Sequence, residues 1–341
     1  MNSTPFRMFL VSALFTGSQL MAQDIHFTQF DAAPLTLNPA FTGMFNGAVR
    51  VSAIYRNQWV SATMPYNTVS VSVDAPVVTF KNGSYFAAGT QLMRDNIGDG
   101  FNSFSSIASM AFHKLFGYDS SRISLHGCDL AIGFQAGYAQ YASGLNASNL
   151  YFRNDIYIDH YYLLLGNTVN YYLLNTGISF SQTTGSRFNY TIGASANNIN
   201  QPKDELLKRQ NELSGLDKRY TGIAGANWLV TNRVTISPSV IYITFSTRED
   251  YIAGSEFQYK LTKHPNANGN IPSIFLGGWY RTGNTGMVTA AYAFGRLRIG
   301  ISRDFRSDEP NYGGGFEVMA RYIAPGSKKS SHRKAIPCNR F

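Results

Sequence analysis

The chain has 341 residues and a formal net charge of +9, and only 14% of its residues are charged, against about 25% in an average soluble domain. Aromatic residues make up another 14%, and glycine occurs 31 times. The basic residues are spread along the sequence, which indicates no nucleic-acid-binding patch, and two cysteines are too few for a disulfide framework.

Residues 1–22 have the layout of a secretory signal peptide. Arg7 precedes an apolar stretch from Met8 to Phe15, and a more polar end leads to Ala22. After this point no segment approaches the ~18 uninterrupted apolar residues that a spanning helix needs. The sequence therefore predicts a secreted chain without membrane-spanning helices.

The first regular elements follow an Asn-Pro turn at Asn38 and Pro39. Apolar and polar residues alternate from Ala48 to Trp59 and again from Thr68 to Asp74. Strict alternation over this length is typical of half-buried strands, and two such runs in succession predict a hairpin.

Twelve more alternating segments follow along the chain. Their expected bounds are Ser84–Arg94, Asn102–Lys114, Ser124–Ala142, Asn170–Gln182, Arg187–Asn197, Tyr220–Val230, Arg233–Phe245, Tyr251–Leu261, Ile271–Arg281, Gly286–Phe294, Arg296–Arg303 and Tyr312–Ile323. Fourteen strands in all, an even number, predict an all-β fold: a transmembrane antiparallel β-barrel. A secreted β-sandwich or propeller is the alternative, but the low charge and high aromatic content favour the barrel, because in lipid only helices and closed barrels pair every backbone group.

The late strands show the two expected faces. Ile299 and Ile301 alternate with Arg298 and Gly300, so the isoleucines are expected against lipid and Arg298 in the lumen. A charge at position 299 should then harm folding more than Arg298→Gln. A group of aromatic residues is expected to form interfacial girdles: Tyr151, Phe152, Tyr157, Tyr161, Tyr162, Tyr171 and Tyr172.

Four domains follow from this pattern: a signal peptide (1–22), an N-terminal periplasmic segment (23–43), the β-barrel (44–326) and a basic C-terminal tail (327–341). Long connections are expected at Leu145–Asn167 and Asn200–Arg219, the second with a short surface helix that starts at Pro202. The tail has five basic residues and no acid, and it ends in Arg340-Phe341.

Signatures of catalysis are absent from the sequence. It contains no G-x-S-x-G, H-E-x-x-H or P-loop pattern, and its six histidines lack metal-ligand spacing. We therefore expect no enzymatic activity, no cofactor and no metal site.

Several motifs together resemble one known family. QDIHFTQF (23–30), LNPAFTG (37–43), YRNQW (55–59) and SVSVDAP (70–76) look like the N-terminal signature of the PorP/SprF family, and GRLRIGISRDF, GGGFEVMARY and the final PCNRF resemble its last segments. The resemblance implies an outer-membrane protein of the type IX secretion and gliding-motility system. Such a protein supports secretion, or the surface anchoring of a client such as an adhesin. The implied partners are periplasmic lipoprotein or ring components of the machinery, the client and outer-membrane lipid.

The non-strand parts are the expected docking sites. In a bacterial barrel both termini lie on the periplasmic side, so residues 23–43 and the tail are expected to contact the machinery, and loop 145–167 the client. Among the candidate residues, Arg56–Trp59 are expected to be structural or interfacial, and Arg340-Phe341 to dock. The full candidate set is Asn38, Pro39, Arg56, Asn57, Gln58, Trp59, Arg340 and Phe341.

A passive solute channel is the alternative function. Fourteen strands enclose enough space for water unless side chains or chain segments fill it. The state of the lumen therefore decides between the two functions.

Overall fold

The structure is a computed structural model, and it describes residues 27–58, 66–97, 101–117, 126–143, 168–202, 216–246, 248–262, 271–306 and 314–326. Three short helices come first: η1 (Phe30–Ala32), α1 (Pro34–Leu37) and η2 (Pro39–Phe41). Fourteen strands follow: β1 (Arg50–Gln58), β2 (Tyr66–Thr79), β3 (Tyr85–Ile97), β4 (Phe101–Phe116), β5 (His126–Ser143), β6 (Thr168–Thr184), β7 (Phe188–Asn197), β8 (Arg219–Leu229), β9 (Val234–Phe245), β10 (Arg248–Lys260), β11 (Ser273–Arg281), β12 (Thr285–Phe294), β13 (Leu297–Arg306) and β14 (Phe316–Ile323).

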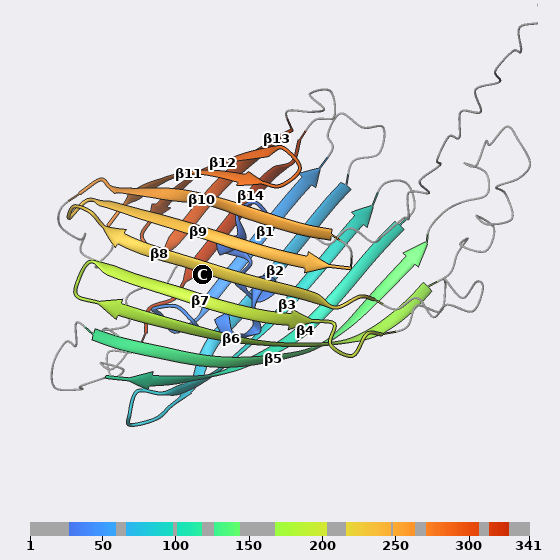
Figure 1. Ribbon diagram of the computed structural model, residues 1–341, viewed down its shortest axis with the longest axis horizontal. Helices are drawn as coiled ribbons and strands as arrows, with labels where there is room; N and C mark the ends of the chain where they lie inside the picture. Colours follow the sequence, from blue (N-terminus) through green and yellow to red (C-terminus); the bar gives the residue numbers. More distant parts are fainter. Residues whose placement is uncertain are drawn as a thin grey trace, which may run out of the picture.

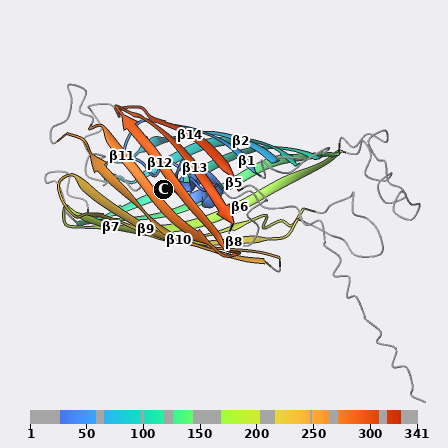
Figure 2. The same ribbon diagram turned by 90° about the horizontal axis from the view of Figure 1, so that it is seen from above.

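The strands form one closed antiparallel barrel (Figures 1 and 2). Each strand pairs with its neighbours in sequence, and β1 closes the ring by pairing with β14, with Arg50 opposite both Asp74 and Ile323. The prediction of a fourteen-stranded barrel is confirmed. Strand bounds differ from the expected ones by a few residues at most ends, because alternation defines the middle of a strand better than its ends.

The two faces of the wall follow the predicted alternation. Ile299 and Ile301 are 43% and 50% exposed on the outside, whereas Arg298, which precedes Ile299, is 5% exposed and points inward. Closure leaves no free edge of unpaired backbone groups, so the outer face needs only apolar side chains against lipid. Among the described residues, no helix is long and apolar enough to cross a membrane.

Aromatic side chains gather at both ends of the outer face. We call the end where β1 finishes and β14 begins the outward end, because the two longest connections of the chain, 144–167 and 198–218, lie there. The opposite end is then periplasmic. Exposed aromatic residues mark the outward end at Tyr55, Phe104, Tyr172, Tyr220, Tyr251, Tyr280 and Phe305, and the periplasmic end at Phe80, Phe116, Phe188, Trp228, Tyr259, Phe294 and Tyr322.

Of the residues predicted for the girdles, Tyr172 lies outside but Tyr171 does not. Tyr171 is 5% exposed and packs inside with Ala139, Val169 and Leu173. Successive strand residues point to opposite faces, so two adjacent tyrosines cannot share a girdle. The other five predicted positions, 151–162, lie outside the described residues, as do the predicted signal peptide and the predicted helix that starts at Pro202.

The N-terminal segment lies inside the barrel. Residues 27–44, which we call the plug, run through the middle of the ring of strands (Figures 1 and 2). Nearly all of them are buried. The sequence predicted a periplasmic segment over 23–43; from Phe27 onward this segment is in the lumen instead, because its apolar side chains and its main chain find partners on the inner wall.

The two-faced wall gives a direct test. Ile301→Arg places a charge against hydrocarbon near the middle of β13. We expect it to lower the free energy of unfolding, and so the stability of the barrel, by about 2–4 kcal/mol. Ile301→Val keeps the surface apolar and is the matched control. Urea titration in lipid vesicles measures both, and equal stability of the two variants would contradict the assignment of this face to lipid.

Candidate functional site

The plug is a chain of short turns fixed by its own sequence. Pro34 begins α1, and Pro39 begins η2, positions where the missing proline N–H costs nothing. The Asn38 side chain caps η2 by accepting a hydrogen bond from the Ala40 N–H at 2.9 Å. Gly43 then turns the chain with a φ of 75°, a conformation that glycine adopts without strain.

Apolar plug residues complete a core that the barrel alone lacks. Phe30, Leu37 and Phe41 pack against wall residues of β8, β9, β10 and β12, and Phe30 also meets the Trp279 ring edge-on with centroids 4.8 Å apart. Phe27 and Ala33 join a second cluster, with wall residues of β1, β11, β12 and β14. Burial of a side chain of this size contributes about 1.5–3 kcal/mol, so these contacts hold the plug in place.

A buried charge cluster holds the start of the plug near the outward end. Arg56 of β1 pairs with Glu317 of β14 and with Asp304 of β13, the latter at 2.7 Å. The Glu317 carboxylate also accepts the main-chain N–H groups of Thr28 and Gln29, at 2.7 and 2.9 Å. Glu317 is fully buried, so these partners supply the interactions that a buried carboxylate needs.

Two further clusters hold the end of the plug near the periplasmic end. Arg50 donates to both oxygens of Asp74 and to the Phe41 carbonyl, and Asp74 accepts the Gly43 N–H at 2.7 Å. His113 of β4 lies next to them: its Nδ1 is 2.9 Å from Asp129, and its Nε2 donates to the carbonyl of Thr42 at 2.9 Å. The plug is thus fixed at both ends by charged wall residues.

Between these ends the plug crosses the lumen and lies directly on the wall. Asn38 donates to the carbonyls of Ile178 in β6 and Ala194 in β7, at 3.0 and 3.1 Å. Gly133 and Gly177, paired across β5 and β6, leave the space for this approach. A Cβ on Gly133 would lie 2.2 Å from the Pro39 main chain, so a larger residue there would push the plug away.

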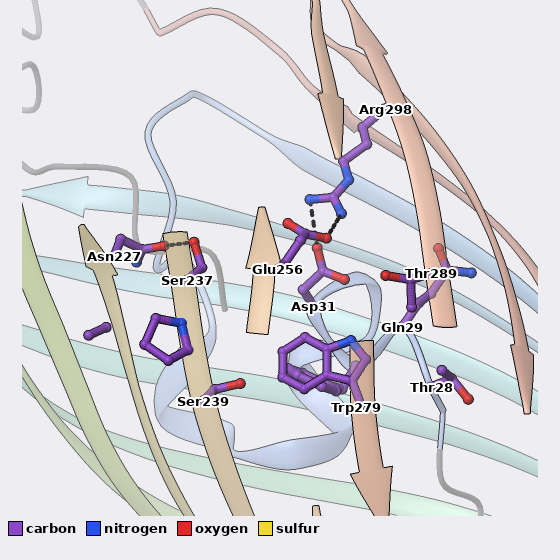
Figure 3. A pocket seen from close by; sticks show the side chains of 13 residues that line it. Thr28, Gln29, Asp31, Asn227, Ser237, Ser239, Glu256, Trp279, Thr289 and Arg298 are labelled. Carbon is purple, nitrogen blue, oxygen red and sulfur yellow. Dashed lines mark hydrogen bonds and ion pairs between the residues drawn. The ribbon is translucent and has the colours of Figure 1, made fainter. Parts of the chain in front are cut away.

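A pocket with polar and apolar lining residues remains beside the plug, between residues 28–31 and strands β8 to β13 (Figure 3). Arg298 lies on one side, ion-paired with both Asp31 of the plug and Glu256 of β10. The Gln29 side chain lines the same pocket, and both of its amide atoms are buried without a hydrogen-bond partner among the residues that the structure describes. The pocket therefore offers one free donor and one free acceptor to water or to a small polar molecule.

The structure brings together only some of the predicted site residues. Asn38, Pro39 and Arg56 are fully buried and fasten the plug, so a partner has no access to them while the plug is in place. Asn57 and Gln58 end β1 at the outward rim and are half-buried. Trp59, Arg340 and Phe341 lie outside the described residues, as does the whole predicted tail.

Five inner-wall residues that hold the plug or support its contacts were not among the predicted site residues. They are four acids and one histidine: Asp74, His113, Asp129, Asp304 and Glu317. All five lie on the inward face of a strand, and buried charges at such positions need opposite charges or hydrogen bonds. The sequence did contain a signal for these ion pairs, because the late strands carry the acids Asp304 and Glu317 and the first strand carries Arg50 and Arg56.

Arg298 lies in the lumen, as the sequence predicted, and Arg298→Gln was expected to harm folding less than a charge at position 299. Its guanidinium is enclosed by Asp31, Glu256 and the Phe275 ring, 4.1 Å from the ring centroid. Removal of this charge would take a cation from the buried Glu256 and one of the two arginines that pair with Asp31, which is destabilising.

The charge cluster at Glu317 yields a quantitative prediction. Glu317→Gln keeps the shape but removes the charge that pairs with Arg56 and accepts two plug N–H groups, and we expect a loss of about 1.5–3 kcal/mol. Glu249→Gln, at an exposed position of β10, is the control and should stay within about 0.5 kcal/mol. Urea unfolding followed by tryptophan fluorescence compares them; an unchanged midpoint for Glu317→Gln would contradict the role of this carboxylate.

Comparison with known proteins agrees with this architecture. Residues 20–322 match the model of a family described as type IX secretion system membrane protein PorP/SprF. No curated protein sequence matches the chain.

Among solved structures, the chain is similar to several channels, transporters and porins. The CymD monoaromatic hydrocarbon channel shares 10% identity at a TM-score of 0.49, over 85% of this chain and 91% of that one. The toluene transporter TbuX of Ralstonia pickettii shares 10% identity at a TM-score of 0.45, over 85% and 92%. The KdgM porin in complex with disordered oligogalacturonate shares 10% identity at 0.35, over 80% and 98%.

The family match covers almost the entire barrel, from before the plug to the end of β14, and the closed barrel with its apolar outer face suits an outer membrane. The chain therefore belongs to the PorP/SprF family of type IX secretion system membrane proteins and is an outer-membrane β-barrel.

Proposed function

We propose that the protein is a non-enzymatic accessory barrel of the type IX secretion system that supports the secretion or surface anchoring of a client protein such as an adhesin. The filled lumen is the observation that carries this proposal. Wall and plug residues meet in apolar clusters and in buried ion pairs across the lumen. A barrel filled by its own chain is suited to hold a partner rather than to pass solutes.

The alternative, a passive solute channel, needs a continuous aqueous path. The polar residues of the inner wall, such as Ser72, Ser179 and Thr191, favour this alternative. The plug argues against it, because its charged contacts at both ends would have to break before solutes pass.

Two surfaces remain for partners in this proposal. The basic tail, 327–341, follows the periplasmic end of β14 and supplies Arg340 and Phe341 for the lipoprotein or ring components of the machinery. Arg offers a fork of donors to a carboxylate, and Phe adds apolar area at low entropic cost. The long outward connection 145–167 is proposed for the client.

Ion conductance separates the two functions. In a planar bilayer we expect the intact protein to give no stable porin-like steps, because residues 27–44 block the lumen. A variant that lacks these residues should conduct. Steady porin-like conductance of the intact protein would favour the solute channel.

Tail truncation tests the docking role. A chain that ends at Gly326 keeps all fourteen strands, so it should stay heat-modifiable on gels while surface labelling of the client falls. Arg340→Ala with Phe341→Ala should reproduce the loss, and Asn339→Ala is the matched control. Normal client labelling in the truncated strain would remove the tail from the proposal.

A further inference from the structure

Many of the hydrogen bonds between the inner wall and the plug go to the plug's main chain. Wall carboxylates accept plug N–H groups: Glu317 those of Thr28 and Gln29, and Asp74 that of Gly43. The wall therefore presents acceptors where the bound chain presents donors.

Wall donors reach the plug carbonyls in the same way. Gln135 Nε2 donates to the Leu35 carbonyl at 2.9 Å, and Ser195 Oγ donates to that of Leu37 at 2.6 Å. Arg219 donates to the Thr36 carbonyl at 2.8 Å. Every residue has a carbonyl, and all but proline have an N–H, so these contacts tolerate many sequences.

The wall also fits a bound chain in shape. Gly133 and Gly177 leave a flat surface on which the main chain of Pro39 lies, and a Cβ on Gly177 would come within 2.0 Å of the Asn38 side chain. Side-chain preferences are limited to a few places. An acid at position 31 meets Arg298 and Arg321, and apolar residues at 30, 37 and 41 enter the core cluster.

The barrel does not depend on the plug for its closure. The hydrogen bonds between β1 and β14 join residues 50–57 to 316–323, outside the plug. Inward-facing polar residues such as Ser72, Ser179 and Thr191 would be hydrated in an empty lumen. The site can therefore be vacated without opening the ring of strands.

We propose that the lumen is a peptide-binding site, occupied in cis by residues 27–44, which takes a segment of the client polypeptide when the plug is displaced. The segment it fits has an aromatic residue followed by an acid, then apolar residues and a small or proline-containing turn. The claim that the bound segment comes from the client rests on the proposed function above. The claim that the lumen binds a peptide does not depend on it.

The first experiment measures peptide binding directly. The probe is a fluorescein-labelled peptide of residues 27–44, added to a full-length variant that lacks these residues and to the intact protein in detergent. Fluorescence anisotropy should show saturable binding to the deletion variant and little to the intact barrel. No binding to a heat-modifiable deletion variant would overturn the proposal.

Two peptide variants isolate the main-chain contact. Gln29→Ala removes a side chain whose amide has no partner among the described residues, and it keeps the N–H that Glu317 accepts. Gln29→Pro also removes that N–H, at a residue whose φ of −91° is close to the proline range. We expect the Pro peptide to bind about tenfold or more weakly than the Ala peptide. Equal affinities would contradict main-chain recognition.

The second experiment tests exchange in cells and does not need the deletion variant. The hydroxyls of Thr42 in the plug and Ser109 in β4 are 2.5 Å apart, so T42C/S109C should form a disulfide that locks the plug. The oxidised double variant should lose surface display of the client, and each single cysteine variant should keep it.

Tail truncation separates failure of this inference from failure of the proposed function. Normal display with a locked plug, together with lost display in the tail-truncated strain, would overturn exchange but leave the accessory function. Normal display in both strains would overturn exchange and would also remove the tail from the proposed function. If the deletion variant does not fold, the locked plug decides alone.

Discussion

The burial of charge inside the barrel is the constraint on which the rest of the structure depends. Glu317 and Arg56 lie on the inward faces of neighbouring strands and are withdrawn from water. A buried charge is tolerated only when opposite charges and hydrogen bonds replace its hydration. Arg56 supplies the charge, and the main-chain N–H groups of Thr28 and Gln29 supply the hydrogen bonds. The plug thus supplies the hydrogen bonds that replace hydration of these wall residues in the filled lumen.

The same reasoning connects the plug to function. Its ends are fastened by charged groups, at Glu317 near the outward end and at Asp74 near the periplasmic end, while its middle lies on the glycine surface of β5 and β6. Such a segment blocks the lumen along its length. Several of the wall groups that hold it bind main-chain N–H and carbonyl groups, which every polypeptide has. Such a lumen is consistent with the family, whose members belong to a protein secretion system.

Alternation in the sequence was sufficient to predict the fold. A period of two is imposed by the strand itself, so Ile299 and Ile301 could be assigned outside and Arg298 inside without a structure. The plug could not be found in this way, because residues 27–44 have no period, and their prolines and turns have the composition of an exposed loop. Tyr171 was misplaced because local clustering of aromatic residues was given more weight than the face of the strand.

The candidate site depended on contacts between distant parts of the chain. Thr28 meets Glu317, and Asn38 meets Ala194, across separations that no local pattern encodes. Inward acids such as Asp304 indicated that something must neutralise them, but the sequence could not specify whether water, another strand or a plug would do so. The tail residues Arg340 and Phe341 stay predictions.

Hydrogen exchange in the plug is the most direct test of the account. The N–H groups of Thr28, Gln29 and Gly43 donate to buried carboxylates, so the native protein in lipid vesicles should protect peptides that span residues 27–44 about as well as the strands. Mass spectrometry after deuterium labelling resolves these peptides. Exchange at the rate of an unfolded chain in residues 27–44, beside protected strands, would contradict a lumen filled by the plug.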